Sequence, residues 1–138
     1  MALDIRWKQR LQNFDRAVTL LREPIAMGVD TLSTLEKEGM IQRFEVALEL
    51  GWKTLKDYLE FAGVTISPVT PRNVIKEAFA AKILPDAQVW LDMLDHRNVL
   101  SHTYDAATFE EVVNVTCVRY MPAIESLHDW LTQRRDDA

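Results

Sequence analysis

The sequence is poor in the residues that shape small secreted proteins and turn-rich β proteins. Its 138 residues include one cysteine, four glycines and five prolines. A single cysteine cannot form an intrachain disulfide and provides no cysteine-rich metal site. So few glycines and prolines argue against a β protein with many tight turns. These shortages favour a helical protein.

Long apolar runs and an excess of positive charge are missing as well. No apolar run approaches the roughly 20 residues of a membrane-spanning helix, and the first residues lack the apolar core of a signal peptide. The net charge is −5, which argues against non-specific coating of nucleic acid, since that affinity comes mainly from Lys and Arg. A small, locally basic site remains compatible with this charge. We therefore expect a soluble cytoplasmic protein with no membrane association.

Apolar residues recur with the period of an α-helix along most of the chain. The first stripe covers residues 7–21, after which Pro24 and Gly28 break the pattern. A second helix is expected over residues 34–62, with Gly63 as its stop. The chain therefore begins with two long amphipathic helices.

Glycine and proline also mark features further along the chain. Gly51 lies inside the second stripe, where it costs about 1 kcal/mol against alanine and predicts the close approach of another backbone. Thr70 is expected to cap a short helix that has Pro71 in its first position and ends near Ala81. Pro85 is expected to open the next helix.

The last predicted helix has a cap signal at its start and a proline inside it. Asp105 or Thr108 can cap it, and Glu111 would complete a capping box with Thr108. Pro122 should kink it, because proline removes a backbone donor. Without an internal repeat or a linker, residues 1–138 are predicted to form one all-α domain, an up-and-down helical bundle of four long helices plus one short helix.

The most unusual polar segment, RNVLSHTY at residues 97–104, ends the predicted fourth helix. At about 100° per residue, Arg97 projects into the middle of an apolar arc, and a buried arginine is rare unless it is paired. Glu45 and Glu49 lie four residues apart on the second helix and are the candidate partners. An ion pair with one of them, an oligomer interface and a functional site are all compatible with this position.

Arg97 and His102 suit chemistry at a phosphodiester bond. An arginine fork binds phosphate oxygens, and a histidine transfers protons near neutral pH. On one straight helix the two positions point about 140° apart, so one copy makes a splayed site unless the helix unwinds after Leu100. Two copies facing across a two-fold axis would bring both pairs into one cleft. The spacing alone is a weak pattern and does not make catalysis the favoured interpretation.

The other histidines and the tryptophans are weaker signals. His96 and His128 are expected to face solvent or an interface, and the four tryptophans are expected in the core or an interface. No grouping of His, Asp and Glu has convincing metal-ligand spacing, so no metal site is predicted.

Two segments resemble a known family. RNVLSHTY matches the R-x4-H-x-Y form of the HEPN-domain motif, with the expected polar residue present as Asn98. The predicted second helix, IQRFEVALELGWKTLKDYLEFAG, is similar to the signature helix of the nucleotidyltransferase substrate-binding family, a HEPN branch. The five-helix layout also fits along nearly the whole chain.

The resemblance implies a HEPN bundle that forms a homodimer, with the two motifs meeting in a cleft at the interface. Its partner would be a minimal nucleotidyltransferase encoded by an adjacent gene. Relatives of the HepT type are toxins, metal-independent endoribonucleases that cut RNA, including tRNA, and that the partner neutralises by AMP transfer to the motif tyrosine. On this chain Arg97 and His102 would be catalytic, Asn98 would support them and Tyr104 would accept AMP. No cofactor is implied.

The older family name implies a different role, a non-catalytic subunit that binds the substrate or nucleotide of the partner. In that case Arg97 and His102 would line a binding cleft with residues of the second helix, namely Glu45, Glu49, Trp52 and Lys53. In a third interpretation the chain is a helical dimerisation module in which Arg97 forms a structural ion pair with a glutamate. The residues alone leave these three interpretations open.

Overall fold

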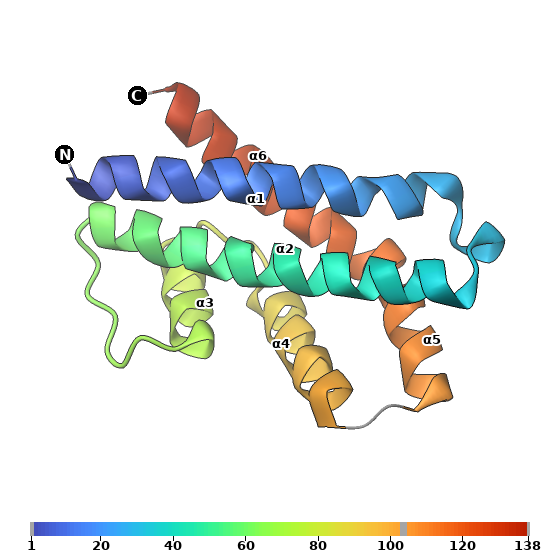
Figure 1. Cartoon of the computed structure of the whole chain (residues 1–138). Helices are drawn as coiled ribbons and strands as arrows, with labels where there is room; N and C mark the ends of the chain where they lie inside the picture. Colours follow the sequence, from blue (N-terminus) through green and yellow to red (C-terminus); the bar gives the residue numbers. More distant parts are fainter. Residues whose placement is uncertain (1, 103–104, 138) are drawn as a thin grey trace.

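The computed structural model describes residues 2–102 and 105–137, with the exception of the His102 side chain. Every regular element in these residues is helical, which confirms the predicted all-α class. Helix α2 lies at the centre, with α1 on one side, α3, α4 and α5 on the other, and α6 passing behind (Figure 1). The four long helices of the prediction correspond to α1, α2, α4 and the continuous run from α5 to α6, and α3 is the short one.

Helix α1 (Ala2–Met27) continues through Pro24, so the predicted break at this proline is wrong. A proline inside a helix frees the carbonyl four residues earlier, because it has no N–H to donate. That carbonyl belongs to Leu20, and it accepts a hydrogen bond of 2.7 Å from Arg43 Nη1 of α2 instead. The helix ends at Met27. Gly28, which has φ of 90°, follows it, and a 3₁₀ turn, η1 (Val29–Thr31), leads into α2.

Helix α2 (Thr34–Phe61) begins and ends where the sequence predicts, within one residue. Ser33 and Glu36 form a reciprocal capping box at its start, which satisfies two backbone donors. Its stop, Gly63, has φ of 90°, a conformation that favours glycine. The prediction that another backbone approaches Gly51 is wrong, because two aromatic side chains lie there instead. A Cβ at this position would lie 3.2 Å from both Phe14 and Trp90.

Helix α3 (Pro71–Ala80) has the predicted cap, since the Thr70 side chain accepts a hydrogen bond from the backbone of Asn73. Helix α4 (Ala87–His102) begins two residues after Pro85, rather than at it. Asp86 Oδ1 accepts a hydrogen bond from the backbone N–H of Gln88 at 2.9 Å. This carboxylate caps the start of α4, where the sequence predicts that Pro85 opens the helix.

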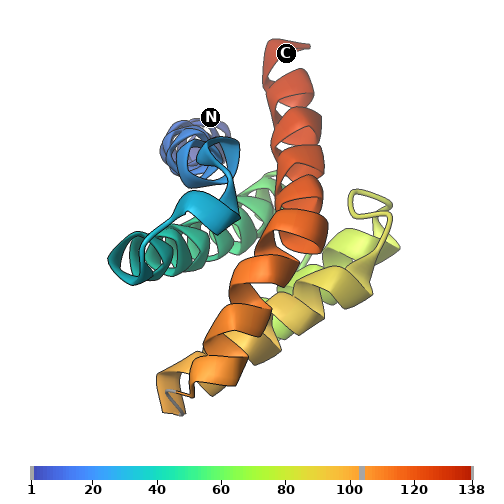
Figure 2. The same cartoon turned by 90° about the vertical axis from the view of Figure 1, so that its right-hand side faces the viewer.

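The last predicted helix is divided into α5 (Ala106–Val115), a π-helical turn η2 (Thr116–Tyr120) and α6 (Met121–Asp136), which form one nearly continuous rod (Figure 2). Asp105 caps α5, so the alternative capping box at Thr108 is wrong. The kink predicted at Pro122 stays a prediction, and a π turn lies just before this proline. There the N–H of Met121 donates to the carbonyl of Thr116, five residues back.

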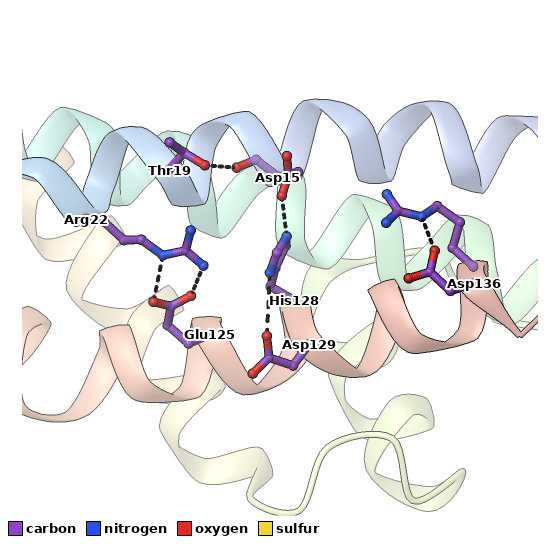
Figure 3. A network of polar contacts seen from close by, with 8 residues as sticks. Asp15, Thr19, Arg22, Glu125, His128, Asp129 and Asp136 are labelled. Carbon is purple, nitrogen blue, oxygen red and sulfur yellow. Dashed lines mark hydrogen bonds and ion pairs between the residues drawn. The ribbon is translucent and has the colours of Figure 1, made fainter.

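Two polar contacts connect α1 to α6 where the helices cross (Figure 3). His128 Nε2 donates to Asp15 Oδ1 at 2.6 Å, and His128 is only 8% exposed. One turn away, Arg22 forms a two-pronged ion pair with Glu125, at 2.8 and 2.5 Å. The expectation that His128 faces solvent or an interface is therefore wrong, because it is buried between two helices of one chain.

The core is a single apolar cluster that draws on all the long helices. Trp7, Phe14, Phe44, Trp90 and Tyr120 are its largest fully buried side chains. Among the described residues, no helix is both long and apolar enough to cross a bilayer.

Candidate functional site

Helix α4 carries the polar segment that the sequence singles out. Arg97 and Asn98 lie on its last turns, and the helix remains regular to His102. The unwinding after Leu100 that would let one copy form a compact site is therefore absent from the described backbone. Positions 97 and 102 stay about 140° apart around the helix axis. The His102 side chain and Tyr104 lie outside the described residues, so their predicted roles stay predictions.

Arg97 meets the second helix through one of the two glutamates that the sequence offers. Its Nη1 donates to Glu49 Oε2 at 3.1 Å. The pair is not fully buried, because 26% of the arginine side chain and 40% of the glutamate side chain are exposed. The ion pair predicted from the apolar arc is confirmed, with Glu49 as the partner, while the arginine keeps an exposed edge.

Glu49 is also the centre of a small polar cluster on α2. Trp52 Nε1 donates to Glu49 Oε2 at 3.0 Å, and Lys53 Nζ lies 3.0 Å from Glu49 Oε1. Partial burial works to raise the pKa of Glu49. Hydrogen bonds from Trp52 and Lys53, with the charges of Lys53 and Arg97, outweigh it and lower the pKa. The glutamate therefore stays ionised at neutral pH and holds three neighbours in place.

Glu45 occupies a different environment one turn along α2. Burial raises the pKa of this carboxyl, and the charge of Arg97 opposes the rise. Its side chain lines a cleft of about 210 Å³ between α2, α4 and α5. The other lining residues are Glu38, Ile41, Leu100, Ser101 and Phe109. The structure thus brings all four predicted substrate-binding residues to the α2 face beside Arg97, with Glu45 at a cleft.

Asn98, the proposed supporting residue, is exposed on α4. The next polar side chain of the motif, Ser101, donates from Oγ to the carbonyl of Arg97 at 3.0 Å. This bond satisfies one of the carbonyls in the last turns of α4 and leaves the guanidinium uninvolved.

Sequence reasoning missed the contacts that hold α4 in position. His96 Nδ1 lies 2.5 Å from the hydroxyl of Tyr120, a fully buried residue in the π turn. About 100° around the helix from His96, Asp95 pairs with Arg72 of α3. His96 therefore packs within the chain, and no spacing signal could reveal a partner 24 residues away. Burial raises the pKa of Tyr120 to about 12, so its hydroxyl stays protonated.

In residues 2–102 and 105–137, no three or more His, Cys, Asp and Glu side chains gather closely enough to hold a metal ion. Arg97 and Lys53 provide hydrogen-bond donors at this place, and Glu45 and Glu49 provide acceptors. Such a set can orient a phosphate at the cations and an N–H-bearing group at the carboxylates.

Comparison with known proteins shows which family the chain belongs to. Residues 9–133 match the family described as nucleotidyltransferase substrate binding protein like. The chain belongs to this family. The match includes α2 and the whole of the α4 motif, so it confirms the resemblance drawn from those two segments.

Two relatives agree with this assignment. A probable ribonuclease HepT from Haemophilus influenzae is 31% identical over 70 residues, which are 49% of this chain and 48% of that protein. The chain therefore spans about half the length of this curated relative. A crystal structure of a protein from Thermus thermophilus superposes with a TM-score of 0.71 at 29% identity. It covers 88% of this chain and 98% of that one, which supports the same helical fold.

Proposed function

We propose that the chain is the HEPN subunit of a minimal nucleotidyltransferase/HEPN pair, a toxin–antitoxin type system, and that it cleaves RNA as a metal-independent endoribonuclease. The observation that carries this proposal is the state of Arg97. One bond to Glu49 anchors its guanidinium, which has five N–H donors, and 26% of the side chain remains exposed. An anchored, partly exposed arginine is suited to receive a phosphate. The HepT-type relative supports the same activity.

The reaction uses the RNA itself as nucleophile. His102 removes the proton of a 2′-hydroxyl, and the 2′-oxygen forms a bond to the neighbouring phosphorus. The bond from phosphorus to the 5′-oxygen breaks, and that oxygen receives the proton that His102 took up, which leaves a 5′-hydroxyl and a neutral histidine. The product is a cyclic phosphate. Arg97 stabilises the negative charge that builds up on the phosphoryl oxygens, and Asn98 supports the pair from the same helix.

The active form in this proposal is a homodimer. Because α4 stays helical to His102, positions 97 and 102 of one copy lie on different sides of the helix. Two copies related by a two-fold axis place the arginine of one beside the histidine of the other. The partner nucleotidyltransferase, encoded by an adjacent gene, binds this dimer.

The partner neutralises the toxin through Tyr104. The tyrosine oxygen attacks the α-phosphorus of ATP, pyrophosphate leaves, and AMP remains on the side chain. Tyr104 follows His102 by two residues in the sequence. The added nucleotide brings bulk and negative charge to the motif, which blocks the site and repels RNA phosphates.

Cleavage of RNA in the presence of EDTA tests the proposed activity. We expect the wild type to cut, and Arg97→Ala and His102→Ala to lose at least about a hundredfold in rate, since each removes a group that acts in the transition state. Glu23→Gln, on α1, changes an exposed carboxylate and should leave the rate unchanged. Equal activity in all four proteins would rule the mechanism out. An intact-mass increase of one AMP after co-expression with the partner, absent in Tyr104→Phe, tests the control step.

The second candidate function is a non-catalytic subunit that binds the substrate or nucleotide of the partner. The gathering of Trp52, Lys53 and Arg97 around Glu49 favours it, because such a cluster is a binding surface without any requirement for His102. This function predicts no RNA cleavage and no growth arrest on expression alone. Hydrogen exchange should then show ligand protection along α2 and α4, and the His102→Ala variant should bind as well as the wild type.

A further inference from the structure

Helix α2 contains a carboxylate that two of its own neighbours hold in place. Trp52 Nε1 donates to Glu49 Oε2 at 3.0 Å, and Lys53 Nζ lies 3.0 Å from Glu49 Oε1. Residues three and four positions apart are neighbours on a helix surface, so both contacts form within α2. Glu49 Oε2 also accepts a hydrogen bond of 3.1 Å from Arg97 Nη1 of α4. One carboxylate oxygen therefore joins the indole to the guanidinium.

Asp4, Trp7 and Lys8 repeat this pattern near the start of α1. Trp7 Nε1 donates to Asp4 Oδ1 at 3.0 Å, and Lys8 Nζ lies 3.2 Å from Asp4 Oδ2. Each lysine also lies beside the ring of its tryptophan, at 5.8 Å in α1 and 5.9 Å in α2. The pattern thus forms within a single helix. Of the two carboxylates, Glu49 is the one that also holds an arginine of another helix.

Trp52 connects this carboxylate to the core. Its ring is partly buried and packs against the apolar cluster, so the packing of the bundle sets its position. The Glu49 side chain is 40% exposed, and glutamate has large rotamer freedom unless its carboxylate is held. The indole N–H removes that freedom with the help of Lys53. The orientation of Arg97 therefore follows from the core through two hydrogen bonds that share one oxygen.

Trp52 and Glu49 have little hydrogen-bonding capacity left for a ligand. An indole has a single N–H, and that of Trp52 is used on Glu49. The two oxygens of Glu49 already face three donors, close to the roughly four that a carboxylate accepts. Arg97 by contrast keeps N–H groups on an edge that is partly exposed. This arrangement suits the holding of an arginine better than the binding of a substrate.

We propose that Trp52 is a positioning residue, which orders Glu49 and through it turns the exposed edge of Arg97 toward a phosphate of the RNA. An arginine that is already oriented loses no freedom when charge builds up on the phosphoryl oxygens. Trp52 itself does not touch the RNA, which separates this inference from the binding-subunit alternative. It rests on the proposed function for the ligand and for the effect on rate.

NMR relaxation of the Arg97 Nε–H tests the ordering without relying on catalysis. The signal that disappears from the full chain in Arg97→Lys identifies this group. We expect an order parameter near about 0.85 in wild type and below about 0.6 in Trp52→Phe, which keeps a ring but loses the N–H. Trp7→Phe removes the equivalent N–H of α1 and should leave the Arg97 value unchanged.

RNA cleavage in EDTA tests the consequence for the reaction. Trp52→Phe should lower kcat roughly tenfold and leave KM within about twofold of wild type, because it disturbs the orientation of a group that acts in the transition state. The double variant Arg97→Ala/Trp52→Phe should be no slower than Arg97→Ala, since Trp52 acts only through the arginine. Trp7→Phe should keep the wild-type rate.

A mobile Arg97 in wild type, or equal order parameters in wild type and Trp52→Phe, would overturn the inference. A raised KM with unchanged kcat, or a further loss in the double variant, would do so too, because either result means that Trp52 contacts the RNA. Circular dichroism confirms that each variant is folded. If Trp52→Phe does not fold, β-(3-benzothienyl)alanine at position 52 keeps the ring size and replaces the N–H by sulfur. A wild type that does not cleave RNA would refute the ribonuclease, and the relaxation measurement would still decide the positioning.

Discussion

The same substitution at two glycines of α2 should change stability in opposite directions. Gly39 and Gly51 both lie inside this helix, where glycine is less favourable than alanine. A Cβ at Gly39 meets nothing within 4 Å. A Cβ at Gly51 meets Phe14 Cε1 at 3.2 Å and two ring carbons of Trp90 at 3.2 and 3.3 Å. The pair thus separates helix propensity from packing within one element.

The magnitudes follow from these contacts. Gly39→Ala should raise the free energy of unfolding by about 0.5–1 kcal/mol, the helix-propensity gain alone. Gly51→Ala has the same gain but forces apart two rings that are 0% and 1% exposed and have no free space to move into. Overpacking of this kind costs roughly 1–3 kcal/mol. The net result is a loss of about 1 kcal/mol, and a difference of about 2 kcal/mol between the two variants.

Urea unfolding followed by circular dichroism measures both changes, with equal m-values as the check that only stability has changed. About 1 kcal/mol corresponds to a shift in Tm of roughly 3–5 °C for a chain of this length. Adding Phe14→Leu to Gly51→Ala should give a smaller total loss than the sum of the single variants, because the smaller side chain relieves the contact. Stabilisation of Gly51→Ala equal to that of Gly39→Ala would refute the packing argument.

Three further predictions concern contacts between helices. Burial raises the pKa of Tyr120 from 10.0 to about 12, so its contribution to stability is complete below pH 10 and is lost as the pH rises toward 12. The free energy of unfolding, measured with urea, should therefore fall more steeply above pH 10 in wild type than in Tyr120→Phe. The same variant should lose about 1–2 kcal/mol at neutral pH, since it leaves His96 Nδ1 without its partner. His128→Ala removes a largely buried imidazole and its partly buried bond to Asp15, and should cost about 2 kcal/mol or more. Arg22→Ala, at an exposed pair, should cost under about 1 kcal/mol. Similar losses in both variants would contradict the role assigned to the burial of His128.

Pro24 shows why some boundaries could not be predicted from the sequence. A proline in a helical pattern normally ends the helix, because it leaves a carbonyl four residues earlier without a donor. In this chain Arg43 of the neighbouring helix supplies the missing donor to Leu20. Pro24 does leave the Leu20 carbonyl without a backbone donor, but Arg43, 23 positions after Leu20, donates to it instead. Only the packing of α1 against α2 reveals that compensation.

The candidate site divides in the same way. The pairing of Arg97 with a glutamate of α2 could be predicted, since a charged residue on an apolar arc requires a partner and the second helix offers two. The choice of Glu49 over Glu45 depends on how α2 and α4 cross. That choice leaves Glu45 as a partly buried acceptor at a cleft, which no spacing in the sequence distinguishes from its neighbour.

The sequence by itself determined the helical class, most helix boundaries and the family, because these depend on local signals: the 3.6-residue period, caps such as Ser33 and Thr70, and the two motif segments. Tertiary structure alone decided which polar groups meet across helices. The bonds of His96 to Tyr120 and of His128 to Asp15 join residues 24 and 113 positions apart. Such contacts arise from the angles at which whole helices pack, and side-chain volume along the entire interface sets those angles.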